Sequence, residues 1–182
     1  EYTLPRLWDF FEPSRYAHGS YWFDWTTDNE IAWKKNYQKW MAFLKDYHAN
    51  GGRITLGSDA GYIYKIYGFG YIREMELLRE AGLNALEVIH AATLAGAEAL
   101  DMEDEIGSIA LGKKADMVIV KENPLANFKV LYGTGHFKLN DDNQPIRTEG
   151  IKYTIKDGIV YDAQALLDDV KRIVAKEKAS RQ

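Results

Sequence analysis

The chain has 182 residues, of which 46% are hydrophobic and 27% are charged, as in folded globular proteins and unlike disordered ones. Its net charge of −4, without basic stretches interleaved with aromatic residues, argues against a nucleic-acid partner, and the lack of cysteine excludes disulfides, thiolate metal ligands and a cysteine nucleophile. The longest apolar stretch is interrupted by Glu87, His90 and Glu98, so we expect no membrane-spanning helix and no membrane partner.

The first 30 residues are rich in aromatic side chains that follow neither a helical nor an alternating period, and we interpret them as an irregular, partly packed region. Apolar residues at helical spacing then predict a helix that Asp28 or Asn29 caps and that ends near Asn50. The segment 53–58 that follows is short and β-prone, and we predict a strand there with apolar residues suited to burial on both faces.

A second helical pattern covers residues 71–79 and ends at Gly82. Asn84, followed three residues later by Glu87, forms a capping-box pattern that opens a third helix. A further helix of small residues is predicted over 93–100. The order of helix, strand, loop and helix is typical of an α/β fold.

Beyond residue 101 the pattern changes to short β-prone segments at 117–120, 151–155 and 159–161. The last two are joined by Asp157-Gly158, a dipeptide that suits a tight hairpin turn. From about Ala163 the apolar residues return to one face of a predicted terminal helix.

These elements divide the chain into three predicted parts. Residues 1–100 form an α/β part, residues 101–162 a small β part, and residues 163–182 a C-terminal amphipathic helix.

Asp59 is the first candidate for a chemical role, because it stands directly after the predicted strand and before a glycine-flanked loop. In parallel α/β folds, ligands bind at this end of the strands. A carboxylate there can ligate a divalent cation and take a proton from a water that the metal has acidified. The alternative is that Asp59 caps a turn by accepting hydrogen bonds from nearby backbone N–H groups. Position alone favours this alternative.

Several segments carry a more specific pattern when they are taken in order. They are 51–61 (GGRITLGSDAG), 73–78 (REMELL) with 81–83 (AGL), 91–100 (AATLAGAEAL), and 106–120 (IGSIALGKKADMVIV) followed by Asn123-Pro124-Leu125. In this order they resemble the amidohydrolase superfamily, more closely its imidazolonepropionase-like and Xaa-Pro dipeptidase-like members, over roughly residues 31–162. The segment 106–120 has a structural character, since Gly107 and Gly112 permit tight turns before an apolar strand.

The resemblance implies an α/β fold class: the C-terminal part of a distorted (β/α)₈ metal-dependent hydrolase barrel plus part of a small β-sandwich domain. It matches Asp59 to the aspartate that closes the last barrel strand, ligates a divalent metal, zinc foremost, and shuttles the proton of the attacking water. The other ligands of the family, a His-x-His pair, a mid-barrel lysine or glutamate and two more histidines, have no counterpart. The chain's four histidines, His18, His48, His90 and His136, are isolated.

Other candidates have weaker support. Tyr62 and Tyr64 follow the predicted strand, where they would either contact substrate or pack under the loop. Glu87 and His90, three residues apart on a helix, form one half of a di-metal pattern that needs a second copy, so a capping glutamate with a packed histidine is favoured. His18 lies in the aromatic region, where a surface histidine is the more common arrangement.

We therefore expect a C-terminal fragment of a metal-dependent amidohydrolase that hydrolyses C–N bonds in a cyclic amide or dipeptide-like small molecule. A transition-metal site normally takes three or four protein ligands, so this chain alone is expected to bind no metal tightly and to be inactive. The alternatives are a non-catalytic binding domain and one subunit of a split enzyme. An incomplete barrel exposes apolar surface, which predicts a homo-oligomer. The compartment, cytoplasmic or secreted and periplasmic, stays open.

Overall fold

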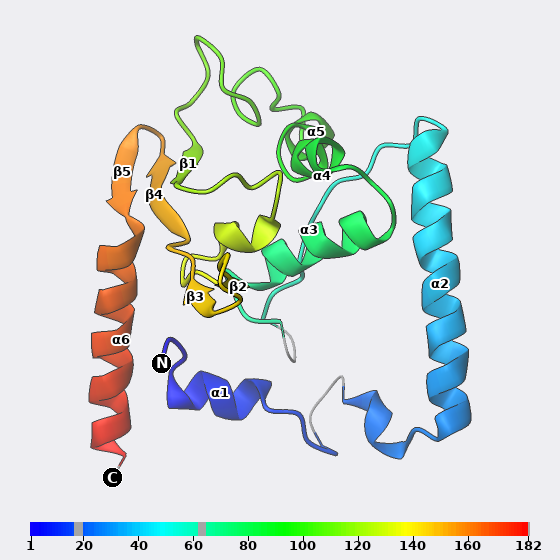
Figure 1. Ribbon diagram of the computed structural model, residues 1–182, viewed down its shortest axis with the longest axis horizontal. Coiled ribbons are helices and arrows are strands. Elements are labelled where there is room, and N and C mark those ends of the chain that lie inside the picture. Colours follow the sequence, from blue (N-terminus) through cyan, green and yellow to red (C-terminus); the bar gives the residue numbers. More distant parts are fainter. Residues whose placement is uncertain (17–19, 62–64, 182) are drawn as a thin grey trace. The chain divides into compact units, whose positions relative to one another are not determined.

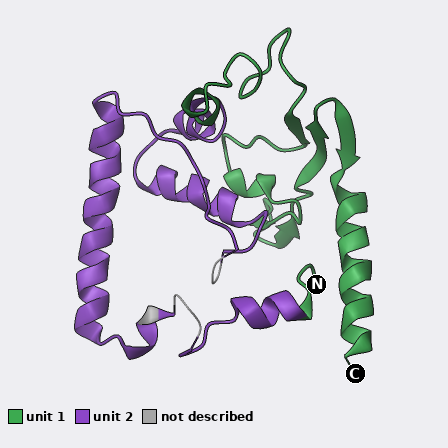
Figure 2. Ribbon diagram, turned by 180° about the vertical axis from the view of Figure 1, so that it is seen from behind, with its two compact units in different colours: residues 1–5, 96–182 green, residues 6–95 purple. Residues whose placement is uncertain are grey.

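The computed structural model describes residues 1–16, 20–61 and 65–181, which form a mixed structure of helices and short strands (Figure 1). The chain divides into two compact units, one of residues 6–95 and one of residues 1–5 and 96–182 (Figure 2). Within the described residues, every helix is too short or too polar to cross a membrane.

The first 30 residues contain two short helices, α1 (Pro5–Phe11) and the 3-10 helix η1 (Tyr21–Asp24). The prediction of a wholly irregular region is therefore wrong for these residues. The helix-forming role of Pro5, the first residue of α1, was overlooked. The fixed φ of proline is suited to this position, and its missing N–H is not needed there.

Helix α2 (Thr27–Ala49) is the longest helix of the unit of residues 6–95. Its N-cap is Thr26, whose side chain accepts a hydrogen bond from the backbone N–H of Asn29, while the Asn29 side chain accepts one from the Thr26 N–H. The predicted cap at Asp28 or Asn29 was thus placed two or three residues too late. The predicted end is confirmed, since Asn50 is the C-cap and Gly51 follows with a φ of 82°.

Residues 53–58, predicted as a strand buried on both faces, are extended but form no strand. Ile54, Leu56 and Ser58 are half-buried, whereas the residues between them are exposed. A strand requires backbone hydrogen bonds to a neighbouring strand. Among the described residues, none donates or accepts a backbone hydrogen bond with this segment. The β-prone composition was recognised correctly, but a strand depends on a partner that local composition does not supply.

Helices α3 (Gly70–Glu80) and α4 (Ala85–Ala91) supply most of the core of this unit. Ile72, Met75 and Leu78 recur every three residues on one face of α3 and are buried. Leu83, in the turn between the helices, and Val88 on α4 are the two largest fully buried side chains of the described residues. Helix α5 (Leu94–Ala99) follows. The three predicted helices of this region are confirmed.

The unit of residues 1–5 and 96–182 contains a three-stranded antiparallel sheet in the order β1 (Met117–Val120), β4 (Ile151–Lys156), β5 (Ile159–Asp162). The predicted hairpin is confirmed, because Asp157 and Gly158 both have positive φ, 51° and 79°, and Lys156 pairs with Ile159.

A second, two-stranded sheet joins β2 (Phe137–Leu139) to β3 (Pro145–Arg147), and a 3-10 helix, η2 (Phe128–Leu131), precedes it. Gly150 has a φ of 74°, and a Cβ atom there would lie 2.2 Å from the Tyr132 carbonyl oxygen. The two backbone segments are therefore too close for any residue other than glycine at position 150. The predicted terminal helix is α6 (Ala163–Ser180), capped by Asp162, with Val174 buried.

Candidate functional site

Asp59 lies at the end of the extended segment, where its side chain is exposed. Its φ of 46° places it in the left-handed region, which aspartate tolerates better than most residues. Among the described residues, no hydrogen bond or ion pair involves its carboxylate. The turn-capping alternative thus has no support among the described residues, but residues 62–64, whose N–H groups Asp59 could cap, lie outside them. Within residues 1–16, 20–61 and 65–181, Asp59 is thus an exposed carboxylate with a left-handed backbone and no polar partner, and such backbone conformations recur at functional sites.

The loop after Asp59 is closed by a hydrogen bond from the Gly61 N–H to the Lys65 carbonyl oxygen, 2.9 Å long. Tyr62 and Tyr64 are inside this loop and lie outside the described residues. Their contact with substrate stays a prediction. On the far side of the loop, Tyr67 comes so close to Gly61 that a Cβ there would lie 2.4 Å from the tyrosine hydroxyl.

The described residues do not form a metal site, since they contain no cluster of three or more histidine, aspartate or glutamate side chains suited to a metal. His48, His90 and His136 are in described segments, and His18 is outside them. A divalent transition metal normally requires three or four protein ligands. Asp59 by itself therefore does not fit such an ion, and further ligands would have to come from elsewhere.

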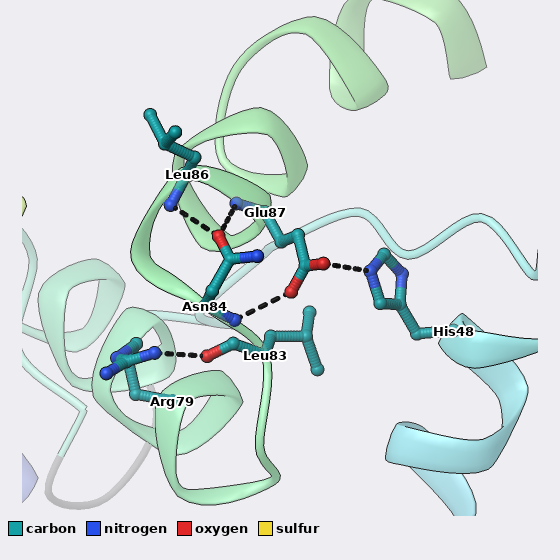
Figure 3. A network of polar contacts seen from close by, with 6 residues as sticks. All are labelled: His48, Arg79, Leu83, Asn84, Leu86 and Glu87. Atoms are coloured by element: carbon teal, nitrogen blue, oxygen red, sulfur yellow. Dashed lines mark hydrogen bonds and ion pairs between the residues drawn. The ribbon is translucent and has the colours of Figure 1, made fainter.

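Glu87 takes part in a polar network at the start of α4 (Figure 3). The Asn84 side-chain oxygen accepts hydrogen bonds from the N–H groups of Leu86 and Glu87, both 3.0 Å long. In return, Glu87 Oε2 accepts a hydrogen bond of 2.6 Å from the Asn84 N–H. The predicted capping role of Glu87 is confirmed, and this carboxylate is engaged in structure.

The other oxygen of Glu87 reaches a second helix. Glu87 Oε1 lies 3.5 Å from Nε2 of His48, near the C-terminal end of α2 (Figure 3). Sequence reasoning missed this pair, because the two residues are far apart in the chain and neither lies in a motif that connects them. His90, which we expected to be packed, is instead exposed. Glu87 and His90 therefore form no metal site with other described residues. The His90 side chain is accessible to solvent.

Two tyrosines support the packing around these helices. The Tyr71 hydroxyl donates a hydrogen bond of 2.5 Å to the Ala92 carbonyl oxygen, and burial raises the pKa of Tyr71. Burial, followed by a hydrogen bond with Glu80, raises the pKa of Tyr37, which connects α2 to α3. Both hydroxyls stay protonated at neutral pH and act as structural groups rather than as acids or bases.

The amidohydrolase family model matches residues 25–160 of this chain, well over half of its length. The chain belongs to the amidohydrolase family, and the resemblance carried by its sequence segments is confirmed.

Individual relatives agree with this assignment. A 5'-deoxyadenosine deaminase from Methanobrevibacter smithii is 40% identical over 90 residues, which cover 46% of this chain and 21% of that protein. An imidazolonepropionase from Thermoanaerobacter pseudethanolicus is 34% identical over 90 residues, or 50% of this chain and 19% of that protein. A solved Xaa-Pro dipeptidase with methionine in its active site matches with a TM-score of 0.52 and 30% identity, covering 67% of this chain and 25% of that one. The chain thus spans about a fifth to a quarter of these relatives.

Proposed function

We infer that this chain is the C-terminal part of a metal-dependent amidohydrolase and that it supplies Asp59 to the active site of the complete enzyme. The observation that carries this proposal is the state of Asp59 within the segment 51–61: exposed, left-handed in its backbone and without a polar partner among the described residues. Membership of the amidohydrolase family supports it.

In this proposal the Asp59 carboxylate has two tasks. It is the one ligand that this chain contributes to a divalent metal, zinc foremost, and the remaining ligands come from outside these 182 residues. It also accepts the proton of the attacking water, a role for which a carboxylate is suited. Tyr62 and Tyr64 are proposed to contact the substrate.

The proposed architecture places α2, the segment 53–59 and α3 as the last helix-strand-helix unit of a (β/α)₈ barrel, within an α/β part that reaches to about residue 100. The sheets within 101–162 would belong to a small β-sandwich, followed by the amphipathic helix of 163–182. The backbone of residues 53–58 has no hydrogen-bond partner among the described residues, and this supports the first assignment, because a barrel provides a neighbouring strand on each side.

The proposed substrate is a small molecule with a C–N bond to be hydrolysed, either in a cyclic amide or in a dipeptide. The names of two similar proteins, an imidazolonepropionase and a Xaa-Pro dipeptidase, describe substrates of these two kinds. A panel that contains an imidazolone, Xaa-Pro dipeptides and 5'-deoxyadenosine therefore covers the chemistry of the relatives.

The test compares Asp59→Asn with Asp101→Asn in the complete polypeptide, assayed on this panel. Both aspartates are exposed and have a positive φ, 46° and 52°, and asparagine is tolerated in that conformation. We expect Asp59→Asn to lower kcat/KM by about 100-fold or more, the usual effect of losing an acid-base group, and Asp101→Asn to leave it unchanged. Full activity of the Asp59 variant would contradict the proposal.

We further propose that the chain self-associates through α2. Trp33, Trp40 and Phe43 follow each other at spacings of seven and three residues along this helix, and their side chains are 52%, 61% and 60% exposed. Such spacing forms a stripe that suits helix–helix packing with a second copy. Analytical ultracentrifugation should show a dimer that Trp40→Lys dissociates, and a monomer for the unmodified chain would contradict this.

A further inference from the structure

A cavity of about 190 Å³ lies within the unit of residues 6–95, apart from Asp59. Its walls come from the C-terminal end of α2, the glycine turn and the start of the extended segment, and helices α4 and α5. Since a water molecule occupies about 30 Å³ of liquid, the cavity has room for a ligand on the order of six heavy atoms. All its walls belong to one compact unit.

Basic side chains surround this cavity. His48, Arg53 and His90 line it, and they come from three different elements. Arg53 and His90 are exposed, and among the described residues neither side chain has a hydrogen-bond or ion-pair partner. Arginine keeps its charge at all physiological pH values and presents its N–H groups in a planar fork that suits a carboxylate.

Glu87 is the one acidic side chain that lines the cavity, and both its oxygens are engaged. Oε2 accepts the hydrogen bond from the Asn84 N–H, and Oε1 faces His48 (Figure 3). Arg53 contributes a permanent positive charge to the cavity, and this charge forms no ion pair among the described residues.

The rest of the lining is apolar. Ile54 is half-buried, and Ala91, the last residue of α4, and Ala95 in α5 are 4% and 5% exposed. A fully hydrated ion such as phosphate would gain nothing from these side chains. An anion with a short aliphatic part would bury that part against them.

We propose that this cavity binds a small aliphatic carboxylate, with Arg53 and His90 holding the carboxylate and Ile54 and Ala91 contacting the alkyl chain. The site is separate from the proposed catalytic role of Asp59 and does not depend on it. His48, Arg53, Glu87 and His90 are the charged or titratable groups of the cavity walls.

The probe is n-butyrate, followed by two-dimensional amide NMR spectra of the 182-residue chain at constant ionic strength. We expect saturable shifts at Arg53, Ile54 and His90 with a millimolar Kd, at least about fivefold weaker in Arg53→Gln, as the loss of one charge-assisted hydrogen bond predicts. His90→Gln should also weaken butyrate binding, because the carboxylate loses the imidazole N–H donor. Both side chains are exposed, so neither substitution disturbs the core.

Arg73→Gln is the matched control, because Arg73 is an exposed arginine of the same unit that does not line the cavity. It should bind butyrate like the unmodified chain, and neutral butyramide should not bind. The proposal is overturned if butyrate gives no saturable shift at tens of millimolar, if Arg73→Gln weakens binding as much as Arg53→Gln, or if inorganic phosphate binds the cavity more tightly than butyrate.

Discussion

Leu83→Ala tests whether the turn between α3 and α4 is the centre of the core that supports the extended segment and the cavity. Leu83 is 2% exposed, and its replacement removes the equivalent of three methylene groups. At about 0.8 kcal/mol for each buried methylene, the transfer term is about 2.4 kcal/mol. The cavity left behind adds to this, so we expect a loss of about 3 kcal/mol in the free energy of unfolding.

Leu86→Ala is its control, because Leu86 lies three residues further along the chain and its side chain is 66% exposed (Figure 3). Urea unfolding followed by circular dichroism measures both variants. Leu83→Ala should lower the midpoint of unfolding strongly with little change in m, whereas Leu86→Ala should stay within about 0.5 kcal/mol of the unmodified chain. Equal effects of the two substitutions would refute the account of this core.

Three further predictions concern local structure. Asn84→Ala should destabilise the chain by about 1 kcal/mol in urea unfolding, because two backbone N–H groups lose their acceptor, while Asn84→Asp should retain most of the stability. The side-chain hydrogen bond from Lys156, followed by the Asp157 N–H, lowers the pKa of Asp116, so its stabilising effect is present above about pH 3.9 and is lost as the pH falls through the lower folded value. Asp116→Asn should therefore flatten the acid side of a plot of thermal midpoint against pH, and an unchanged plot would contradict this assignment. Gly150→Ala should cost more than about 2 kcal/mol, measured by thermal unfolding, because its Cβ would overlap a backbone oxygen.

Local signals in the sequence predicted local structure well. The pattern of Asn84 and Glu87 identified a capping box, and Asp157-Gly158 identified a hairpin turn in which both residues have positive φ. In each case the determining interactions lie within a few residues, so the sequence contains nearly everything that is needed.

Features that depend on distant residues could not be predicted in the same way. Residues 53–58 have the composition of a strand, yet they are unpaired among the described residues, because pairing depends on another segment. His48 and Glu87 lie on two different helices, and neither helix contains a sequence pattern that predicts their contact. The exposure of Asp59 and its left-handed backbone likewise have no signature in the sequence, although its position before Ala60 and Gly61 marked it as a candidate.

The central claim is that this chain contributes one carboxylate, Asp59, to a metal site that it does not complete. The most direct test is metal content by plasma mass spectrometry on the chain purified without chelator, with its intact mass recorded on the same sample. The account predicts far less than one equivalent of zinc or another transition metal at the expected mass. Near-stoichiometric metal would contradict it, whether or not Asp59→Asn removes that metal.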